Sequence, residues 1–359
     1  MPLVPRPGIE KAPLYIPGSH SVEGIADPAI LSANENPHGA SPLAREAYMK
    51  AAASMQRYPD GGATELRNAI ATRNGLDPDR IVCGAGSDEI ITMLTRIFAG
   101  PGDEVLYSEH GFLMYPINAL QVGATPVKAP ETDLRTDVDA LLAHVTDKTK
   151  IVFVANPNNP TGSYLPTDEL RRLANGLPEN VLLVIDAAYA EYVVRNDYTA
   201  GPDLVDEFPN VVMMRTFSKI YGLAAVRLGW CYAQRPVIDL MNRLRSPFNL
   251  STTAQAAGTA AMQDIAHTEK AIAHNSQWLS YLSEELKKLG IEVPPSVGNF
   301  LIAGFGTKET ADAAYAFLKQ RGVIARQMGG YGLADYIRIT IGLEKDCRLC
   351  VDILKDFKG

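Results

Sequence analysis

Short apolar runs alternate with segments of helical periodicity through most of the chain. Continuous apolar runs, each the length of a buried strand, occur at residues 104–107, 151–155, 181–185 and 211–214. Apolar side chains spaced three or four residues apart predict a helix over 90–98. Apolar strands separated by helices are typical of a parallel sheet that helices cover on both faces. The pattern therefore predicts an α/β fold.

The pattern changes toward the C-terminus, where a long polar helix is expected at about 268–288. The elements predicted after it are a strand at 299–305, a helix at 309–321, strands at 323–325 and 336–341, and a last helix at 345–357. Because 359 residues exceed the size at which one core stops growing, two domains are expected. We assign 1–40 to an N-terminal arm and part of the smaller domain, 41–246 to the larger domain, and 247–359 to a smaller α+β domain, with a hinge near Pro247.

Composition and charge narrow the class of protein. The chain is 46% hydrophobic with a net charge of −7, and its acidic and basic residues are interspersed, which argues against a nucleic-acid-binding surface. Its apolar runs fall far short of the roughly 18 residues that span a membrane. The first residues lack the apolar segment of a signal peptide. We therefore expect a cytoplasmic, enzyme-sized protein with no membrane partner.

The four cysteines are too few and too scattered for a disulfide framework. Cys347 and Cys350 have the C-x-x-C spacing, but no second pair and no nearby histidine pair completes a tetrahedral metal site. They fall in the last predicted helix, where Leu349, Ile353 and Leu354 define one apolar face. We interpret both cysteines as packing residues and expect no bound metal.

The sequence RTFSK at 215–219 follows the last of the apolar strands, and Arg227 lies eight residues beyond Lys219. A lysine just past a buried strand can lose water and become a nucleophilic amine, although most such lysines are solvated surface residues. Thr216, Ser218 and Arg227 offer hydroxyls and a guanidinium that suit a phosphate. An amine beside a phosphate site matches the needs of pyridoxal phosphate.

Polar groups also follow two other strands, at the sheet edge where ligands gather. Asp186 closes the strand at 181–185, where its carboxylate needs a partner. A protonated pyridine nitrogen would serve, and a strand-end cap is the alternative. Tyr189 could donate to a ring oxygen or belong to the core. Asn159, in the asparagine- and proline-rich loop at 156–162, could be held to bond a ring oxygen.

The stretch CGAGSD at 83–88 precedes a predicted helix, so its backbone N–H groups are available to a phosphate. It is not a full G-x-G-x-x-G motif, because position 89 is glutamate, and Ser87 could simply be a helix N-cap. By itself the stretch is weak evidence.

Two arginines near the C-terminus lie in apolar surroundings. Arg338 is inside the strand expected at 336–341, and Arg326 follows the apolar residues 323–325. An arginine in such a setting needs an anionic partner. That partner is either a structural carboxylate or the phosphate or carboxylate of a substrate, since both anions suit bidentate contacts.

Motifs spread over nearly the whole chain resemble those of the fold-type I pyridoxal-phosphate enzymes and, within them, of the histidinol-phosphate aminotransferase group. They are LSANENP at 31–37, RYPDG at 57–61, GSDE at 86–89, NPNNPTG at 156–162, RTFSK at 215–219, YGL at 331–333 and RITIG at 338–342. The resemblance implies an aminotransferase that binds pyridoxal 5'-phosphate on its larger domain, around a mostly parallel sheet. It also implies a homodimer with shared active sites.

Individual roles follow from the resemblance. Lys219 would be the catalytic Schiff-base lysine, and Asp186 would pair with the ring nitrogen. The other implied cofactor contacts are Asn159 and Tyr189 at the ring oxygen, Phe112 against the ring, Ser87, Asp88, Thr216, Ser218 and Arg227 at the phosphate, and Tyr58 at the phosphate of the other subunit. The implied substrate pocket is lined by Tyr15, Asn36, Arg326 and Arg338.

Three stretches depart from the family pattern: DAAY at 186–189 replaces DEAY, HGF at 110–112 replaces PTY, and Ala225 stands where glycine is common. Each keeps every group that transamination needs. The expected reaction links histidinol phosphate, or imidazole acetol phosphate, with 2-oxoglutarate or glutamate, in histidine biosynthesis. Aromatic amino acid transamination and decarboxylation of a phosphorylated threonine are the alternatives. A non-catalytic regulator is disfavoured, since the first 30 residues carry no helix-turn-helix pattern.

Overall fold

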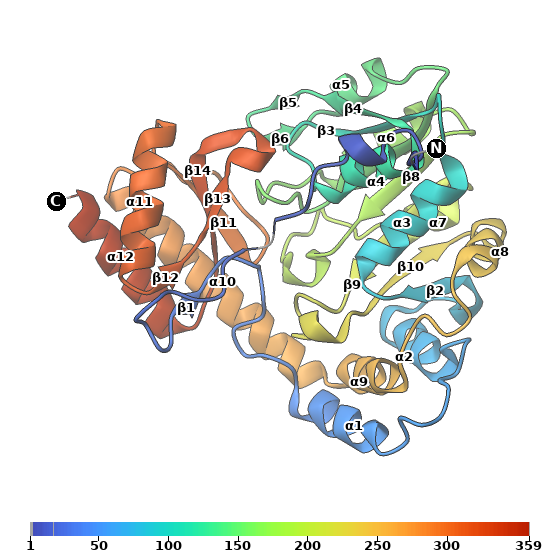
Figure 1. The fold of residues 1–359 in the computed structure, drawn as a ribbon, viewed down its shortest axis with the longest axis horizontal. Helices are drawn as coiled ribbons and strands as arrows, with labels where there is room; N and C mark the ends of the chain where they lie inside the picture. Colours follow the sequence, from blue (N-terminus) through green and yellow to red (C-terminus); the bar gives the residue numbers. More distant parts are fainter. Residues whose placement is uncertain (1–2, 17, 359) are drawn as a thin grey trace.

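The computed structural model describes residues 3–16 and 18–358, and its larger part is built on a seven-stranded sheet (Figure 1). In sheet order the strands are β2 (Ile81–Gly84), β10 (Gly229–Ala233), β9 (Val211–Thr216), β8 (Leu182–Asp186), β7 (Thr149–Ala155), β3 (Glu104–Ser108) and β4 (Thr125–Ala129). β10 runs antiparallel to both neighbours, and the pairs from β9 to β4 are parallel. The mostly parallel sheet expected from the apolar runs is confirmed.

Helices cover both faces of this sheet because its central strands are apolar on both sides. Val184 of β8 packs in one core, while Leu183 and Ile185 pack in the other, as the alternation of a strand requires. The helices of the first core are α3 (Ser87–Phe98), α4 (Met114–Val122) and α8 (Arg235–Leu244). Those of the second are α1 (Pro42–Ala52), α2 (Thr64–Asn74), α5 (Val138–Ala143), α6 (Thr167–Gly176), α7 (Pro202–Glu207) and α9 (Thr252–Gln263).

A smaller unit with its own core follows in the chain. Its antiparallel sheet has the order β11 (Phe300–Gly304), β14 (Leu333–Thr340) and β13 (Arg326–Met328). Its helices are α10 (Ile265–Lys288), α11 (Lys308–Gln320) and α12 (Glu344–Lys358). Near the N-terminus, β1 (Ala29–Ile30) pairs in parallel with β12 (Val323–Ile324), so an early segment joins this late core.

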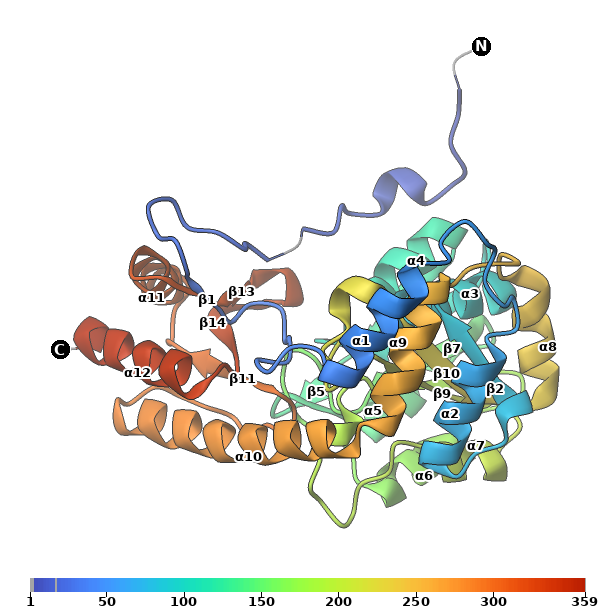
Figure 2. The ribbon, with the colours of Figure 1, turned by 90° about the horizontal axis from the view of Figure 1, so that it is seen from below.

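Two connections hold the larger and smaller units together. The long helix α10 runs from beside α9 to the smaller unit, and the segment between β1 and α1 returns along the same junction (Figures 1 and 2). Helix α9 lies beyond the predicted hinge at Pro247, yet it packs on α1 and α2 within the larger unit's core. The assignment of 1–40, 41–246 and 247–359 to domains stays a prediction.

The C-x-x-C pair lies inside the smaller unit. Cys347 and Cys350 are fully buried on α12 and pack in its apolar core, as packing residues do. Ile353 and Leu354 share that core, but the expectation for Leu349 is wrong, because its side chain is 40% exposed on the outer side of α12. In the described part of the chain, no helix is long and apolar enough to cross a membrane.

Candidate active site

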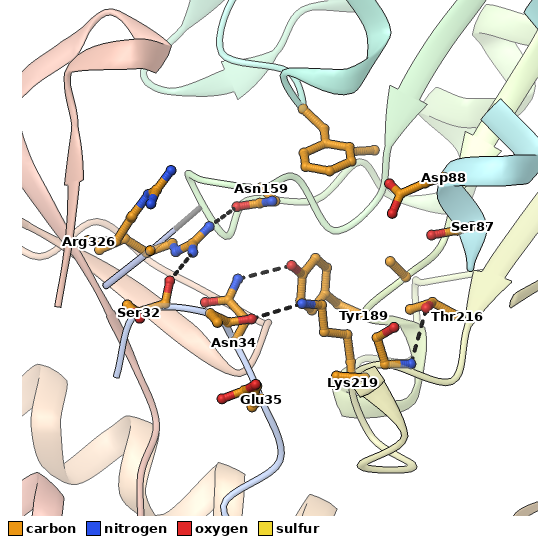
Figure 3. Close-up of a pocket in the computed structure, with 18 of the residues that line it drawn as sticks. Ser32, Asn34, Glu35, Ser87, Asp88, Asn159, Tyr189, Thr216, Lys219 and Arg326 are labelled. Carbon is orange, nitrogen blue, oxygen red and sulfur yellow. Dashed lines mark hydrogen bonds between the residues drawn. The ribbon is translucent and has the colours of Figure 1, made fainter. Parts of the chain in front are cut away.

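A cavity of about 250 Å³ lies where β7, β8 and β9 end and the smaller unit faces them (Figure 3). Ligands of open parallel sheets bind at this edge, because the loops after neighbouring strands converge there. The predicted site residues that line it are Tyr15, Ser87, Asp88, Phe112, Asn159, Asp186, Tyr189, Thr216, Ser218, Lys219, Arg227, Arg326 and Arg338. Asn36 and Tyr58 are placed elsewhere.

Lys219 presents a half-buried amine to this cavity, three residues after β9. Its Nζ donates a hydrogen bond to the Ala33 carbonyl oxygen at 3.0 Å. Burial, and then the charge of Arg338, lower the pKa of Lys219 to about 8. A lysine with this pKa has a substantial neutral fraction near physiological pH, and the neutral amine is the nucleophile and the base.

Asp186, the last residue of β8, lies 5% exposed at the floor of the cavity. Its Oδ2 accepts a hydrogen bond from the Tyr115 hydroxyl at 2.7 Å, and its Oδ1 accepts one from the Ala188 N–H at 3.2 Å. Burial raises the pKa of Asp186 to about 6, while both hydrogen bonds favour its ionised form. This oriented carboxylate suits a cationic ring nitrogen.

The residues expected to hold the phosphate line the cavity at the start of α3. Helix α3 begins at Ser87, so the N–H groups of Ser87 and Asp88 belong to its open N-terminus. The guanidinium of Arg227 lies beside them, with Nη2 at 2.9 Å from Oδ2 of Asp88. Gly86 has a φ of 82°, and a Cβ there would lie 2.5 Å from Arg227 Nη2, so only glycine lets the guanidinium approach.

Two hydroxyl-bearing residues of the Lys219 loop, Thr216 and Ser218, line the same cavity. The Ser218 N–H donates to Oγ1 of Thr216 at 3.1 Å, which leaves the hydroxyl hydrogen of Thr216 available to a ligand. Backbone donors, two hydroxyls and an arginine together form a donor set suited to a phosphate. The residues present therefore fit a ligand with a phosphate at one end and a basic ring nitrogen at the other.

Asn159 and Tyr189 also line the cavity. An Nη1–H of Arg338 donates to Oδ1 of Asn159, so the Asn159 NH₂ group remains as a donor toward a ligand. The Tyr189 hydroxyl oxygen accepts from Nδ2 of Asn34 at 3.0 Å. Phe112, half-buried at the same wall, supplies an apolar ring face.

Arg338 and Arg326 reach the cavity from the smaller unit. They are directly paired residues on the neighbouring strands β14 and β13. Arg338 is 7% exposed and donates to the Ser32 carbonyl oxygen at 2.7 Å, while Arg326 donates to the Ile16 carbonyl oxygen at 2.6 Å. Among the described residues neither guanidinium forms an ion pair with a carboxylate, so the structural salt bridge is not found there.

Two of the predicted site residues, Asn36 and Tyr58, do not line the cavity. Asn36 is buried and uses its amide inside the protein: Nδ2 donates to the Ile220 carbonyl oxygen at 2.7 Å, and Oδ1 accepts from the His38 N–H at 2.9 Å. It therefore fixes the segment that passes Lys219 and is not part of the cavity wall. Tyr58 is 83% exposed and stacks on Phe248, with ring centroids 4.6 Å apart.

The sequence analysis missed two side chains that hydrogen-bond to predicted site residues. Tyr115 lies in α4, 71 positions before Asp186, and Asn34 lies 155 positions before Tyr189. Only the packing of α4 against β3 and β4, and of the N-terminal segment over the cavity, brings these partners together. For Asn34 the one available signal was its place within the motif at 31–37.

Comparison with known proteins agrees with this geometry. The chain belongs to the aminotransferase class I and II family, whose model matches residues 26–354. Histidinol-phosphate aminotransferase of Paramagnetospirillum magneticum is 54% identical over 357 residues, which cover 99% of this chain and 98% of that protein. The protein of the same name from Rhodospirillum centenum is 53% identical over 355 residues, 99% of this chain and 98% of that protein.

Solved structures resemble the chain over most of its length. The crystal structure of histidinol-phosphate aminotransferase from Sinorhizobium meliloti in complex with pyridoxal-5'-phosphate has a TM-score of 0.88 and 28% identity, covering 92% of this chain and 90% of that one. Aspartate aminotransferase from Thermus thermophilus with maleate has a TM-score of 0.81 at 22% identity, covering 92% of this chain and 91% of that one, and shows the fold alone. The fold and family implied by the motifs are confirmed.

Proposed function

We propose that this aminotransferase uses pyridoxal phosphate to move an amino group between L-histidinol phosphate and 2-oxoglutarate. The observation that carries the proposal is that the Lys219 amine shares one cavity with the Asp186 carboxylate and with the paired guanidiniums of Arg326 and Arg338. Relatives named histidinol-phosphate aminotransferase support the substrate, since they are 51–54% identical over nearly the whole chain.

Different residues of the cavity would hold different parts of the cofactor. When bound, pyridoxal phosphate supplies an aldehyde for an amine and a ring that withdraws electrons from the carbon bearing the amino group. Asp186 would hold the ring nitrogen, and Asn159 with Tyr189 would hold the ring oxygen. Ser87, Asp88, Thr216, Ser218 and Arg227 would hold the phosphate, and Phe112 would cover the ring.

Lys219 would be the catalytic acid and base. With a pKa lowered to about 8, its Nζ can accept the proton from the substrate carbon that bears the amino group. The same Nζ can deliver that proton to the neighbouring cofactor carbon. Ala33 keeps the amine at this position through the bond to its carbonyl oxygen.

Arg338 and Arg326 would bind the anionic group of each substrate. The phosphate of histidinol phosphate would occupy them in one half-reaction, and a carboxylate of glutamate would occupy them in the other. Tyr15, which is 48% exposed at the mouth of the cavity, would cover the rest of the substrate.

An amino-donor panel tests the substrate. The protein loaded with pyridoxal phosphate is assayed with 2-oxoglutarate against histidinol phosphate, phenylalanine, tyrosine and phosphothreonine, with histidinol as the matched control. We expect the highest kcat/KM with histidinol phosphate and a loss of at least about tenfold when its phosphate is absent. Faster turnover of an aromatic amino acid, or release of carbon dioxide, would assign one of the two alternative reactions instead.

We also infer a homodimer, because many large apolar side chains are exposed. They are Leu3, Val4, Leu14 and Ile16 on the N-terminal segment, Leu43, Met49 and Met55 on or just after α1, and the stacked pair Tyr58 and Phe248. A second copy would cover them, and the exposed Tyr58 would then reach the partner's phosphate site. A cytoplasmic location is supported by the four cysteines, all of them free.

Subunit mixing tests the shared site. Tyr58→Ala and Lys219→Ala proteins, each inactive or weak, are mixed, unfolded and refolded together. Half of the resulting dimers would hold one intact site of two, so about one quarter of the wild-type activity is expected. Lys219→Ala mixed with the Tyr58→Ala/Lys219→Ala double variant is the control and should stay inactive. Full activity of a demonstrably monomeric sample would contradict the proposal.

A further inference from the structure

Three buried polar residues from separate segments meet beside Lys219. Asn34, Tyr189 and Thr340 are 1%, 4% and 3% exposed. The Asn34 backbone N–H donates to Oγ1 of Thr340 at 3.0 Å, and Oγ1 of Thr340 donates back to Oδ1 of Asn34 at 3.0 Å. Nδ2 of Asn34 donates to the Tyr189 hydroxyl oxygen at 3.0 Å, a bond drawn in Figure 3.

The donor and acceptor roles of these three residues determine which way the Asn34 amide and the Tyr189 hydroxyl point. A backbone N–H can only donate, so the Thr340 oxygen accepts there and its own hydrogen is left for Oδ1 of Asn34. The Asn34 amide therefore turns its NH₂ group toward Tyr189. Because the Tyr189 oxygen accepts this bond, its hydroxyl hydrogen is free to donate to a group in the cavity.

The backbone conformation and the backbone hydrogen bonds of Asn34 fix its position. Its φ of 56° lies in the left-handed region, which asparagine tolerates better than most residues. Its carbonyl oxygen accepts from Nδ2 of Asn299 at 2.9 Å, so both its backbone polar groups are bonded to the smaller unit. Thr340 lies two residues from Arg338 on β14, on the same face of the strand.

We propose that Asn34 is a positioning residue that directs the Tyr189 hydroxyl hydrogen toward the ring oxygen of the bound cofactor, with Thr340 setting the orientation of the Asn34 amide. The inference rests on the proposed function. Together with the NH₂ group of Asn159, this gives the ring oxygen two donors and stabilises its anionic form. The network also ties the ring contact to β14, the strand that carries the substrate's anion site.

Asn34→Asp is the decisive variant, because it keeps the shape and reverses the bond. A carboxylate can only accept, so Tyr189 would donate to it and turn its hydrogen out of the cavity. We expect the dissociation constant of pyridoxal phosphate from the apoprotein to rise about tenfold, and kcat/KM to fall by tenfold to about a hundredfold. The pH midpoint of the bound cofactor's absorption change should move upward, since the anionic ring oxygen loses a donor.

Three comparisons keep the test specific. Asn34→Ala removes the donor without reversing it and should have a smaller effect than Asn34→Asp. In a Tyr189→Phe background, Asn34→Asp should change cofactor affinity by less than about twofold, because the residue acts through Tyr189. Thr340→Ser keeps the hydroxyl and should retain the wild-type pH midpoint of the absorption change. The isosteric Thr340→Val removes the hydroxyl and should shift that midpoint. If Asn34→Asp does not fold, these two Thr340 variants test the inference in its place.

An unchanged cofactor affinity and absorption midpoint in Asn34→Asp would overturn the inference. So would independent, multiplicative effects of Asn34→Asp and Tyr189→Phe. Cofactor affinity and the absorption midpoint are measured with pyridoxal phosphate alone, so they do not depend on the amino donor. A wild-type chain that binds no pyridoxal phosphate would refute the proposed function itself, and is thereby distinguished from failure of the Asn34 inference.

Discussion

Lys219→Ala should slow transamination by about 10⁴-fold or more, the upper range for removal of a group that transfers protons in catalysis. Lys219 is the one lysine that lines the described cavity, and its Nζ lies 5.7 Å from the centroid of the Tyr189 ring. Stopped-flow rates with a saturating amino donor measure the loss. Lys308→Ala, which removes a solvent-exposed lysine on α11, is the matched control and should leave the rate unchanged.

The pH dependence of cofactor capture is a second test of the role of Lys219. The reactive form of Lys219 is the neutral amine, and its pKa is lowered to about 8. The rate at which the apoprotein captures pyridoxal phosphate should therefore rise with pH up to about 8 and level off above it. An ordinary lysine, with a pKa of about 10.4, would give a rate that continues to rise beyond pH 9. Capture by Lys219→Ala at the wild-type rate would exclude Lys219 as the attachment point.

The sequence could predict the main strands because each is buried on both faces. The expected strands at 104–107, 151–155 and 211–214 occur within two residues of β3, β7 and β9, since apolar runs of this length have no other stable place in an α/β fold. Asp186 and Lys219 could be proposed for the same reason: a polar residue at the end of such a run lies at the edge where ligands bind.

The partners of those residues could not be predicted in this way. The bond from Tyr115 to Asp186 depends on how a helix packs under the sheet, and the bond from Asn34 to Tyr189 depends on a segment that crosses between the two units. For Asn36 the error is the opposite one, because it was predicted to line the substrate pocket and does not. It lies in the same motif as Asn34, yet its amide bonds to the backbone of Ile220, and no pattern of residue types distinguishes these two asparagines.

Arg338 and Arg326 form a pair that needs an anion. They lie directly opposite one another on β14 and β13, and like charges in that relation repel. Arg338 is nearly buried, and its Nε is one of the few buried polar atoms in the described residues without a hydrogen-bond partner. A buried, unpaired donor is costly, so its retention beside the cavity points to a ligand that completes it.

Arg338→Lys should therefore reduce kcat/KM by about 30-fold to several thousandfold in both half-reactions, since losing one partner of a buried charge pair costs about 2–5 kcal/mol. Lysine keeps the charge but presents one ammonium in place of a planar fork, so it cannot bind Asn159, Ser32 and a substrate anion together. Single-turnover rates with histidinol phosphate and with glutamate measure the two half-reactions. Arg348→Lys, at an exposed arginine of α12 that pairs with Glu344, is the control and should change neither. A lower rate with only one of the two amino donors would mean that different residues bind the anionic groups of the two substrates. Wild-type rates with both donors would show that Arg338 binds neither anion.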